Sequence, residues 1–268
     1  MGNGRILVAL VMAGIALFSY FSSKSYNPVT DEEQYIAITR DQEIALGLQS
    51  RPQMMQQHGG LLNDPDVQDY VDYICDRILS NSAAMQAEWP YECHVLADGQ
   101  TVNAFALPGG QMFLTLALYN QLETEGQVAG VMAHEIGHVV ARHSAQQIAK
   151  AQLTQGLTGA AILAAYDPDN PRSAATAQMV AMIGQVVNMK YGRDDELESD
   201  QLGVWFMSEA VYDPRALIDV MQILDEASSG SRPPEFLSTH PNPDNRIEQI
   251  ELAIDQVFPA GVPNGLTQ

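Results

Sequence analysis

Basic residues are scarce in this chain of 268 residues, which has 13 lysines and arginines against 33 aspartates and glutamates. Proteins that bind nucleic-acid phosphates need clustered basic surface, so a net charge of −20 argues against nucleic acid as a partner. Charged residues make up only 17% of the chain and hydrophobic residues 46%, which is too apolar for a disordered chain. The length suits one domain of good size with small attachments.

Cysteine is also rare, because the chain contains only Cys75 and Cys93. Two cysteines are too few for a disulfide framework or for a zinc module held by four thiolates. In an oxidising compartment they could form one disulfide, and the sequence leaves this open. The chain shows no internal repeat and no low-complexity tract.

An apolar segment over residues 6–21 follows Arg5 and precedes a polar run of serines and Lys24. This layout is typical of a secretory signal or a signal-anchor, and the segment is near the lower length limit for a spanning helix. No cysteine lies near its end, which excludes a lipoprotein anchor. We therefore expect residues 1–25 to be a signal peptide or membrane anchor, which would place the rest in the bacterial periplasm or cell envelope, secreted or anchored to the inner membrane. A buried core helix is the alternative.

Periodicity and turn signals predict an α+β fold that is mainly helical. Residues 26–62 form a helical lead-in, residues 63–258 the main domain and residues 259–268 a tail. Short strand patterns separated by Asp98-Gly99 and by a proline-glycine turn predict a small antiparallel meander over residues 91–96, 101–107 and 111–115. Helical patterns follow over residues 123–150, 151–166, 173–191, 194–207, 214–227 and 244–257.

The sequence His-Glu-Ile-Gly-His at residues 134–138 is the strongest chemical signal in the chain. On a helix, His134 and His138 lie on the same face and can reach one metal ion. Glu135 lies about 100° further round the helix, where it can take a proton from a metal-bound water without ligating the metal. The pattern is that of metal-dependent hydrolases.

A catalytic zinc ion needs a third protein ligand, and the acidic run at residues 194–200 is the best source. Glu196 and Asp200 are four residues apart and so share a helix face, where one can ligate zinc and the other can hydrogen-bond a ligating histidine. A solvated acidic helix face is the alternative. His143 would lie roughly 140° from the ligand face of a continuous helix, so we interpret it as a solvated or capping residue.

Four ordered motifs resemble the HtpX-like and CAAX-prenyl-protease-like zinc metalloproteases, which are gluzincins. They are the segments HEIGH at 134–138, ELESD at 196–200, NAFALPGG at 103–110, and THP at 239–241 with Arg246. The resemblance is to a stand-alone periplasmic type of member. It implies a zincin-like domain with a small antiparallel sheet beside the HExxH helix, and one Zn²⁺ ion per chain. By this resemblance His134, His138 and Glu196 are the zinc ligands, Glu135 is the general base, and Asp200 supports a ligand.

Three further residues are candidates for contact with substrate or metal. His240 lies on a proline-rich loop, where it could occupy the open zinc position and keep the enzyme latent, or stabilise the transition state by a hydrogen bond. A structural histidine is the alternative. Arg246 could pair with an active-site carboxylate or a substrate carbonyl, or be a surface arginine. Asn103 is a candidate for substrate binding, because an extended peptide can add to a sheet edge formed by strand 102–106 or 111–115.

These features together predict a zinc-dependent metalloendopeptidase that acts on unfolded or misassembled cell-envelope proteins. Zinc would activate a water molecule and Glu135 would accept its proton. The membrane is a partner through the N-terminal segment if that segment is retained. The alternative is a chaperone or adaptor of envelope quality control that uses the same fold with latent proteolysis.

Overall fold

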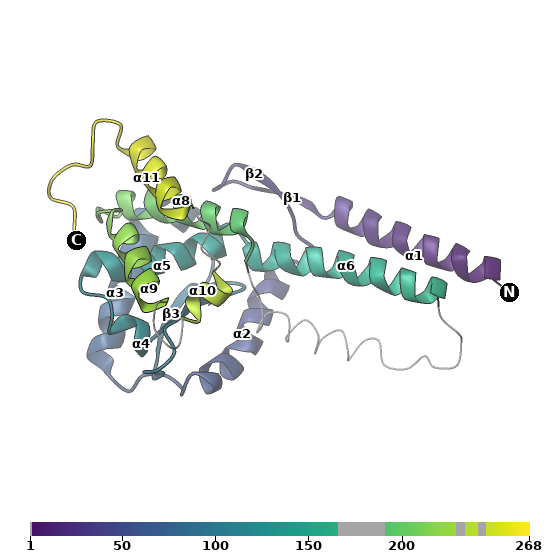
Figure 1. The fold of residues 1–268 in the computed structure, drawn as a ribbon, viewed down its shortest axis with the longest axis horizontal. Coiled ribbons are helices and arrows are strands. Elements are labelled where there is room, and N and C mark those ends of the chain that lie inside the picture. Colours follow the sequence, from purple (N-terminus) through teal and green to yellow (C-terminus); the bar gives the residue numbers. More distant parts are fainter. Residues whose placement is uncertain (1, 166–190, 229–233, 241–244) are drawn as a thin grey trace.

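The computed structural model describes residues 2–165, 191–228, 234–240 and 245–268. A rounded body of helices surrounds a small sheet, and two long helices project from it side by side (Figure 1). The elements of the N-terminal half are α1 (Gly2–Ser22), β1 (Lys24–Asn27), β2 (Glu32–Tyr35), α2 (Arg40–Gln57), α3 (Pro65–Asn81), the 3-10 helix Ala83–Ala87, β3 (Glu92–Leu96), β4 (Ala104–Leu107), β5 (Gln111–Thr115) and α4 (Leu116–Tyr119). Those that follow are α5 (Glu125–Val140), α6 (His143–Ala165), α8 (Arg193–Glu209), α9 (Ala216–Ser228), α10 (Phe236–Thr239) and α11 (Arg246–Val257).

Helix α5 is the centre of the body, and every one of its residues from 126 to 140 is buried. The Thr124 side chain caps its start by accepting a hydrogen bond from the Gln127 amide. Helices α3, α8 and α9 and the sheet pack around it. The mainly helical α+β prediction is confirmed, and so is a helix through residues 134–138.

The sheet has the strand order β3-β5-β4, so β5 is central and β4 is an edge strand. The strands lie where the sequence predicts them, but the antiparallel meander is wrong, because β3 pairs with β5 in parallel and only β4 pairs with β5 antiparallel. The tight hairpin forms at Gly109 and Gly110, which have positive φ angles of 78° and 101°. Asp98-Gly99 does not form a second hairpin but begins the connection that takes the chain past β5. Asp98 Oδ1 there accepts from the amides of Gln100 and Thr101.

Helix α5 ends at Val140, so the prediction of one helix from residue 123 to about 150 is wrong. Arg142 has a φ of 56°, and α6 begins directly after it. Side chains from the β1–β2 hairpin satisfy the last carbonyls of α5, since Asn27 Nδ2 donates to Val140 O and Gln34 Nε2 donates to Ala141 O. Tertiary contacts therefore end this helix, and no local stop signal does.

Arg142 is held in its left-handed conformation by an ion pair with the buried Glu43 on α2. Its Nε and Nη2 atoms donate to Glu43 Oε2 over 3.0 Å and 2.7 Å. The break in the helix is thus fixed by two independent parts of the lead-in, and it turns the chain into α6 at a new angle.

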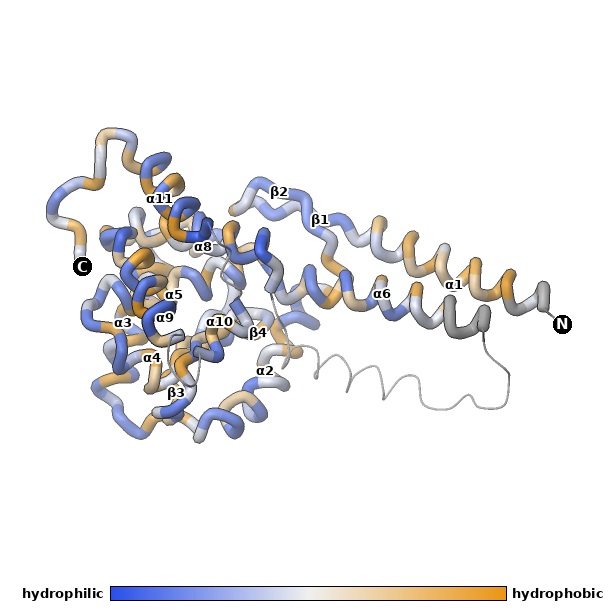
Figure 2. The backbone as a smooth tube through the Cα atoms, in the orientation of Figure 1, coloured by the Kyte–Doolittle hydropathy of each residue, from blue (hydrophilic) through white to orange (hydrophobic). Residues whose placement is uncertain are grey.

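Helices α1 and α6 form the projection, running side by side in Figures 1 and 2. Gly156 of α6 lies so close that an added Cβ would be 2.6 Å from the Cβ of Ala16. Much of α1 is coloured orange for hydrophobic residues in Figure 2. Its exposed large apolar side chains are Ile6, Leu7, Val8, Leu10, Val11, Ile15, Leu17, Phe18 and Phe21. It is therefore not a buried core helix. Within the described ranges, no helix combines the length and apolarity needed to cross a membrane.

Two further predictions concern the lead-in and the region after α6. Residues 26–62 contain the β1–β2 hairpin as well as helix α2, so the lead-in is not helical alone. The helix predicted over residues 151–166 is the second half of α6. The predicted helix 173–191 falls almost wholly outside the described residues.

The two cysteines form a disulfide that joins α3 to β3. The sequence allowed this disulfide without requiring it, and in the structure the bond ties the sheet covalently to the helix that packs beside it.

Candidate metal centre

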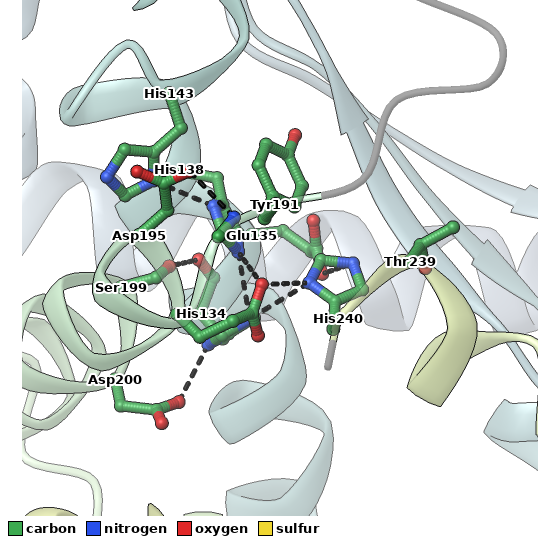
Figure 3. Close-up of polar contacts among 12 residues, drawn as sticks. His134, Glu135, His138, His143, Tyr191, Asp195, Ser199, Asp200, Thr239 and His240 are labelled. Carbon is green, nitrogen blue, oxygen red and sulfur yellow. Dashed lines mark hydrogen bonds and ion pairs between the residues drawn. The ribbon is translucent and has the colours of Figure 1, made fainter. Parts of the chain in front are cut away.

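Four side chains converge at the middle of the body, with ligand atoms that all lie within 4.8 Å of one another. They are His134 and His138 from α5, Glu196 from α8, and His240 from the end of α10, and each is at most 1% exposed. Figure 3 shows the three imidazoles turned toward one another with Glu135 beside them. Helices far apart in the sequence thus supply one compact cluster of nitrogen and oxygen atoms.

The distances in this cluster suit a small divalent cation. His134 Nε2 lies 3.0 Å from His138 Nε2 and 3.3 Å from His240 Nδ1, and His240 Nδ1 lies 3.1 Å from Glu196 Oε1. Ligand atoms at a tetrahedral zinc ion are about 3.3 Å apart, given zinc–nitrogen bonds of about 2.0–2.1 Å. Two histidines and one glutamate, with a fourth position beyond them, are also the donor set of a hydrolytic zinc site.

The packing of α5 against α8 sets this geometry. A Cβ added at Gly137 would lie 2.7 Å from Ser199 Oγ and 2.9 Å from its carbonyl oxygen, so the two helices cross where no side chain intervenes. The Ser199 hydroxyl donates to the carbonyl of His134 at this crossing. Close backbone contact therefore places Glu196 beside Nε2 of His134 and Asp200 beside its Nδ1.

Asp200 supports His134, as the sequence predicts for this residue. His134 Nδ1 lies 2.9 Å from Asp200 Oδ1, which leaves Nε2 free to face the cluster. Arg246 Nε donates to Asp200 Oδ2 over 2.7 Å, and Arg246 Nη1 lies 3.2 Å from Glu196 Oε2. Burial alone would raise the pKa of the Asp200 carboxyl, but the charge of Arg246 and the bond from His134 lower it below its usual value.

Arg246 is therefore not a surface arginine, since it is 1% exposed and pairs with two carboxylates. Of the two pairings that the sequence allows, the one with active-site carboxylates is formed. A contact between Arg246 and substrate stays a prediction.

Glu135 is fully buried beside the cluster, and neither of its carboxylate oxygens has a hydrogen-bond partner among the described residues. Its Oε1 lies 3.6 Å from His240 Nε2, which also lacks a partner there. Burial raises the pKa of the Glu135 carboxyl above its ordinary value. An orphaned carboxylate next to a candidate metal site is the arrangement that a general base needs.

His143 is not solvated, so its interpretation from the sequence is wrong. It is fully buried, with Nδ1 2.8 Å from His138 Nδ1 and Nε2 3.0 Å from Glu198 Oε2. The error has a physical cause: the expectation assumed a continuous helix, whereas the break at Arg142 swings His143 back toward His138.

Sequence reasoning also missed Tyr191, which covers one side of the centre (Figure 3). Its ring stacks on His138 with centroids 3.8 Å apart, and its hydroxyl lies 3.2 Å from Ser144 Oγ and 3.4 Å from the Ala106 carbonyl. Its amide donates to the Thr239 carbonyl over 3.1 Å. A tyrosine just before an acidic helix gives no signal of such a role.

Both β3 and β4 are edge strands, and β4 is the one beside the centre, because its Ala106 carbonyl lies 3.4 Å from the Tyr191 hydroxyl. Asn103 precedes β4 and is buried. Its backbone N–H donates to Thr115 Oγ1, and its side-chain Oδ1 has no partner in the described part of the chain. The Phe236 amide donates to the Val102 carbonyl, so α10 is fastened to the segment that leads into β4. Binding of substrate by Asn103 stays a prediction.

The chain matches known proteases along most of its length. The sequence profile described as peptidase family M48 matches residues 65–254. The beta-barrel assembly-enhancing protease of Escherichia coli K12 is 31% identical over 210 residues, covering 74% of this chain and 41% of the relative. The putative beta-barrel assembly-enhancing protease of Vibrio cholerae is 32% identical over 216 residues, covering 78% of this chain and 43% of the relative.

A mitochondrial protein is similar as well. The mitochondrial metalloendopeptidase OMA1 of Schizosaccharomyces pombe is 31% identical over 235 residues, which cover 87% of this chain and 67% of the relative. The chain spans about two fifths of the length of its bacterial relatives. The family match covers the metal centre, the sheet and most of the helical body, and the chain belongs to peptidase family M48.

Proposed function

We propose that this protein is a zinc-dependent metalloendopeptidase in which His134, His138 and Glu196 hold one Zn²⁺ ion. The observation that carries the proposal is the convergence of these ligand atoms next to the orphaned carboxylate of Glu135. Family membership supports it, and the relatives named above are themselves called proteases or a metalloendopeptidase.

Zinc at this position would supply a Lewis acid that polarises the scissile carbonyl and makes water nucleophilic near neutral pH. Glu135 accepts the proton of the attacking water and then passes it to the leaving amine nitrogen. Its raised pKa favours holding that proton between the two steps. His240 Nε2 lies 3.6 Å from Glu135 Oε1 and has no partner among the described residues, so once His240 has left the ligand cluster this nitrogen would donate a hydrogen bond to the developing oxyanion.

The conformation described here is a latent one in this proposal, because the candidate ligands and Glu135 are at most 1% exposed. His240 Nδ1 lies within the ligand cluster, in the position that an open catalytic site reserves for water or substrate. Movement of α10 and Tyr191 would free that position. It would also free the Ala106 carbonyl on β4, where an extended polypeptide can add as a further strand.

Unfolded or misassembled cell-envelope proteins are the proposed substrates, and the bacterial periplasm or cell envelope is the proposed location. The names of the bacterial relatives support this assignment. The disulfide between Cys75 and Cys93 supports an oxidising compartment. Residues 1–25 would then be a signal peptide or membrane anchor, and the membrane a partner if they are retained.

Glu135→Gln tests the proposal. Cleavage of casein should fall at least about 10³-fold, because the general base is lost, while bound zinc measured by metal analysis stays near one ion per chain. His134→Ala is the matched variant, which should lose zinc and cleavage together. A zinc-free wild type, or undiminished casein cleavage by purified Glu135→Gln, would contradict the proposal.

The closed centre also supports a second candidate function, that of a quality-control chaperone or adaptor with latent proteolysis. It predicts stable capture of an unfolded chain by wild type and Glu135→Gln alike, without detectable turnover. Rapid casein cleavage by wild type would exclude it.

A further inference from the structure

Two residues outside the ligand set, His143 and Glu198, form a chain with His138 that ends at a carboxylate. We propose that this chain fixes the tautomer and orientation of His138 and so acts as the positioning device for one zinc ligand. The inference rests on the proposed zinc site and extends it to two residues to which the resemblance described above assigns no role.

The two ring nitrogens of His138 have different neighbours. His138 Nε2 faces the cluster, 3.0 Å from His134 Nε2 and 3.4 Å from Glu196 Oε1. A neutral imidazole ligates metal through the nitrogen that carries no hydrogen, so the proton of His138 must be on Nδ1. The atom that receives this N–H is His143 Nδ1, 2.8 Å away.

The hydrogen bond from His138 also fixes the tautomer of His143. Because His143 Nδ1 accepts a hydrogen bond, its own proton is on Nε2, which donates to Glu198 Oε2 over 3.0 Å. An ionised carboxylate accepts only, so it sets the direction of both hydrogen bonds. His138 N–H donates to His143, and His143 N–H donates to Glu198, with every proton accounted for.

Comparison with His134 shows why the intermediate ring is needed. His134 bonds directly to Asp200, on the face of α8 that also carries Glu196. Glu198 is two residues from each of these and lies about 200° round the helix from them, on the opposite face. The buried ring of His143 spans the gap between that face and His138.

Several tertiary contacts place His143 between His138 and Glu198. Helix α5 ends before His143 because Arg142 has a left-handed backbone conformation and forms an ion pair with Glu43. The side-chain amides of Asn27 and Gln34, which bond the last carbonyls of α5, also end it there. The ring of Tyr191 stacks on His138, with an interplanar angle of 16°. Stacking fixes the plane of His138, and the hydrogen-bond chain fixes which of its nitrogens faces the metal.

The experiment compares zinc affinity in His143→Leu, His143→Gln and Glu198→Ala, using competition with a chelator of known affinity. His143→Leu and Glu198→Ala should each weaken zinc binding about 10- to 100-fold, the usual effect of removing such a supporting partner. His143→Gln should recover most of the affinity, because an amide oxygen can accept from His138 while its NH₂ group donates to Glu198. His94→Gln, a partly buried histidine that bonds Gln111 outside the centre, is the matched control and should bind zinc like wild type.

A second readout follows the tautomers themselves. The ¹⁵N shifts of zinc-loaded wild type should show protonated Nδ1 for His138 and protonated Nε2 for His143, and Glu198→Ala should abolish the slow exchange of both protons. Because Glu198 is partly exposed, this variant tests the chain even if His143→Leu does not fold.

Unchanged zinc affinity in Glu198→Ala, or no recovery by His143→Gln relative to His143→Leu, would overturn the inference while leaving the zinc enzyme intact. A wild type that binds no zinc would instead overturn the proposed function.

Discussion

The body and the α1–α6 projection differ in what they bury. The body encloses charged side chains at its centre, where Arg246, Asp200, Glu135 and Glu196 are almost inaccessible to solvent. The projection does the opposite, since α1 leaves most of its large apolar side chains exposed. Buried charge is tolerated only with partners or a metal, and exposed apolar surface calls for an external one. The body thus holds the buried charged centre, and the projection presents apolar surface.

Removal of Arg246 should have the largest effect on stability. Arg246→Ala leaves Asp200 and Glu196 buried without their cation, which costs about 3–5 kcal/mol of the free energy of unfolding. Urea denaturation measures it. Arg51→Ala, which removes a partly exposed arginine paired with the partly exposed Glu92, should cost at most about 1 kcal/mol. Equal losses in the two variants would remove the distinction between buried and surface charge.

Loss of the disulfide comes next. Replacing both Cys75 and Cys93 by serine opens a link across 18 residues, and a loop of that size contributes about 3 kcal/mol. Thermal unfolding of the body should shift down accordingly. Reduction of wild type should reproduce the shift, and a reductant-insensitive melting temperature would show that the bond does not restrain the body.

Acid should destabilise the connection after β3 by a smaller amount. Burial alone would raise the pKa of Asp98, but hydrogen bonds from Thr101, Gln100 and His58 lower it to about 2. Because the folded pKa lies below the unfolded value of about 3.9, this stabilisation is complete above that value and is lost as pH falls toward 2. Asp98→Ala should therefore cost about 1–2 kcal/mol at pH 6 and much less at pH 2. A pH-independent difference between variant and wild type would contradict this account.

The smallest effect on stability is expected in the projection. Phe18→Ser on α1 changes a side chain that is 76% exposed, so the free energy of unfolding should change by less than about 0.5 kcal/mol. Binding to vesicles of neutral phospholipid, measured by sedimentation, should nevertheless weaken. Unchanged vesicle binding would argue that lipid does not cover this surface.

The clustering of the candidate ligands could be predicted because it depends on local periodicity. His134 and His138 share a face through spacing alone, and so do Glu196 and Asp200. The strand positions follow from short alternating patterns in the same way. Helix faces and strand positions depend on the residues within the element itself, so they can be predicted from the sequence.

The remaining features depend on contacts between distant segments. The parallel pairing of β3 with β5 follows from the route of a connection, which no strand pattern records. The end of α5 depends on Asn27, Gln34 and Glu43, about a hundred residues earlier in the chain. His143 was misinterpreted for this reason, because its position follows from a break that local sequence does not mark.

The β1–β2 hairpin separates the N-terminal helix α1 from the contacts that end α5. It begins at Lys24, immediately after α1, and pairs Lys24 with Tyr35. A processing protease that cuts between α1 and β1 would release the projecting helix and leave Asn27 and Gln34 in place on α5. A cut beyond Tyr35 would expose the carbonyls of Val140 and Ala141 and loosen the turn before His143. The hairpin thus defines how much of the N-terminal segment could be removed with the centre still in order.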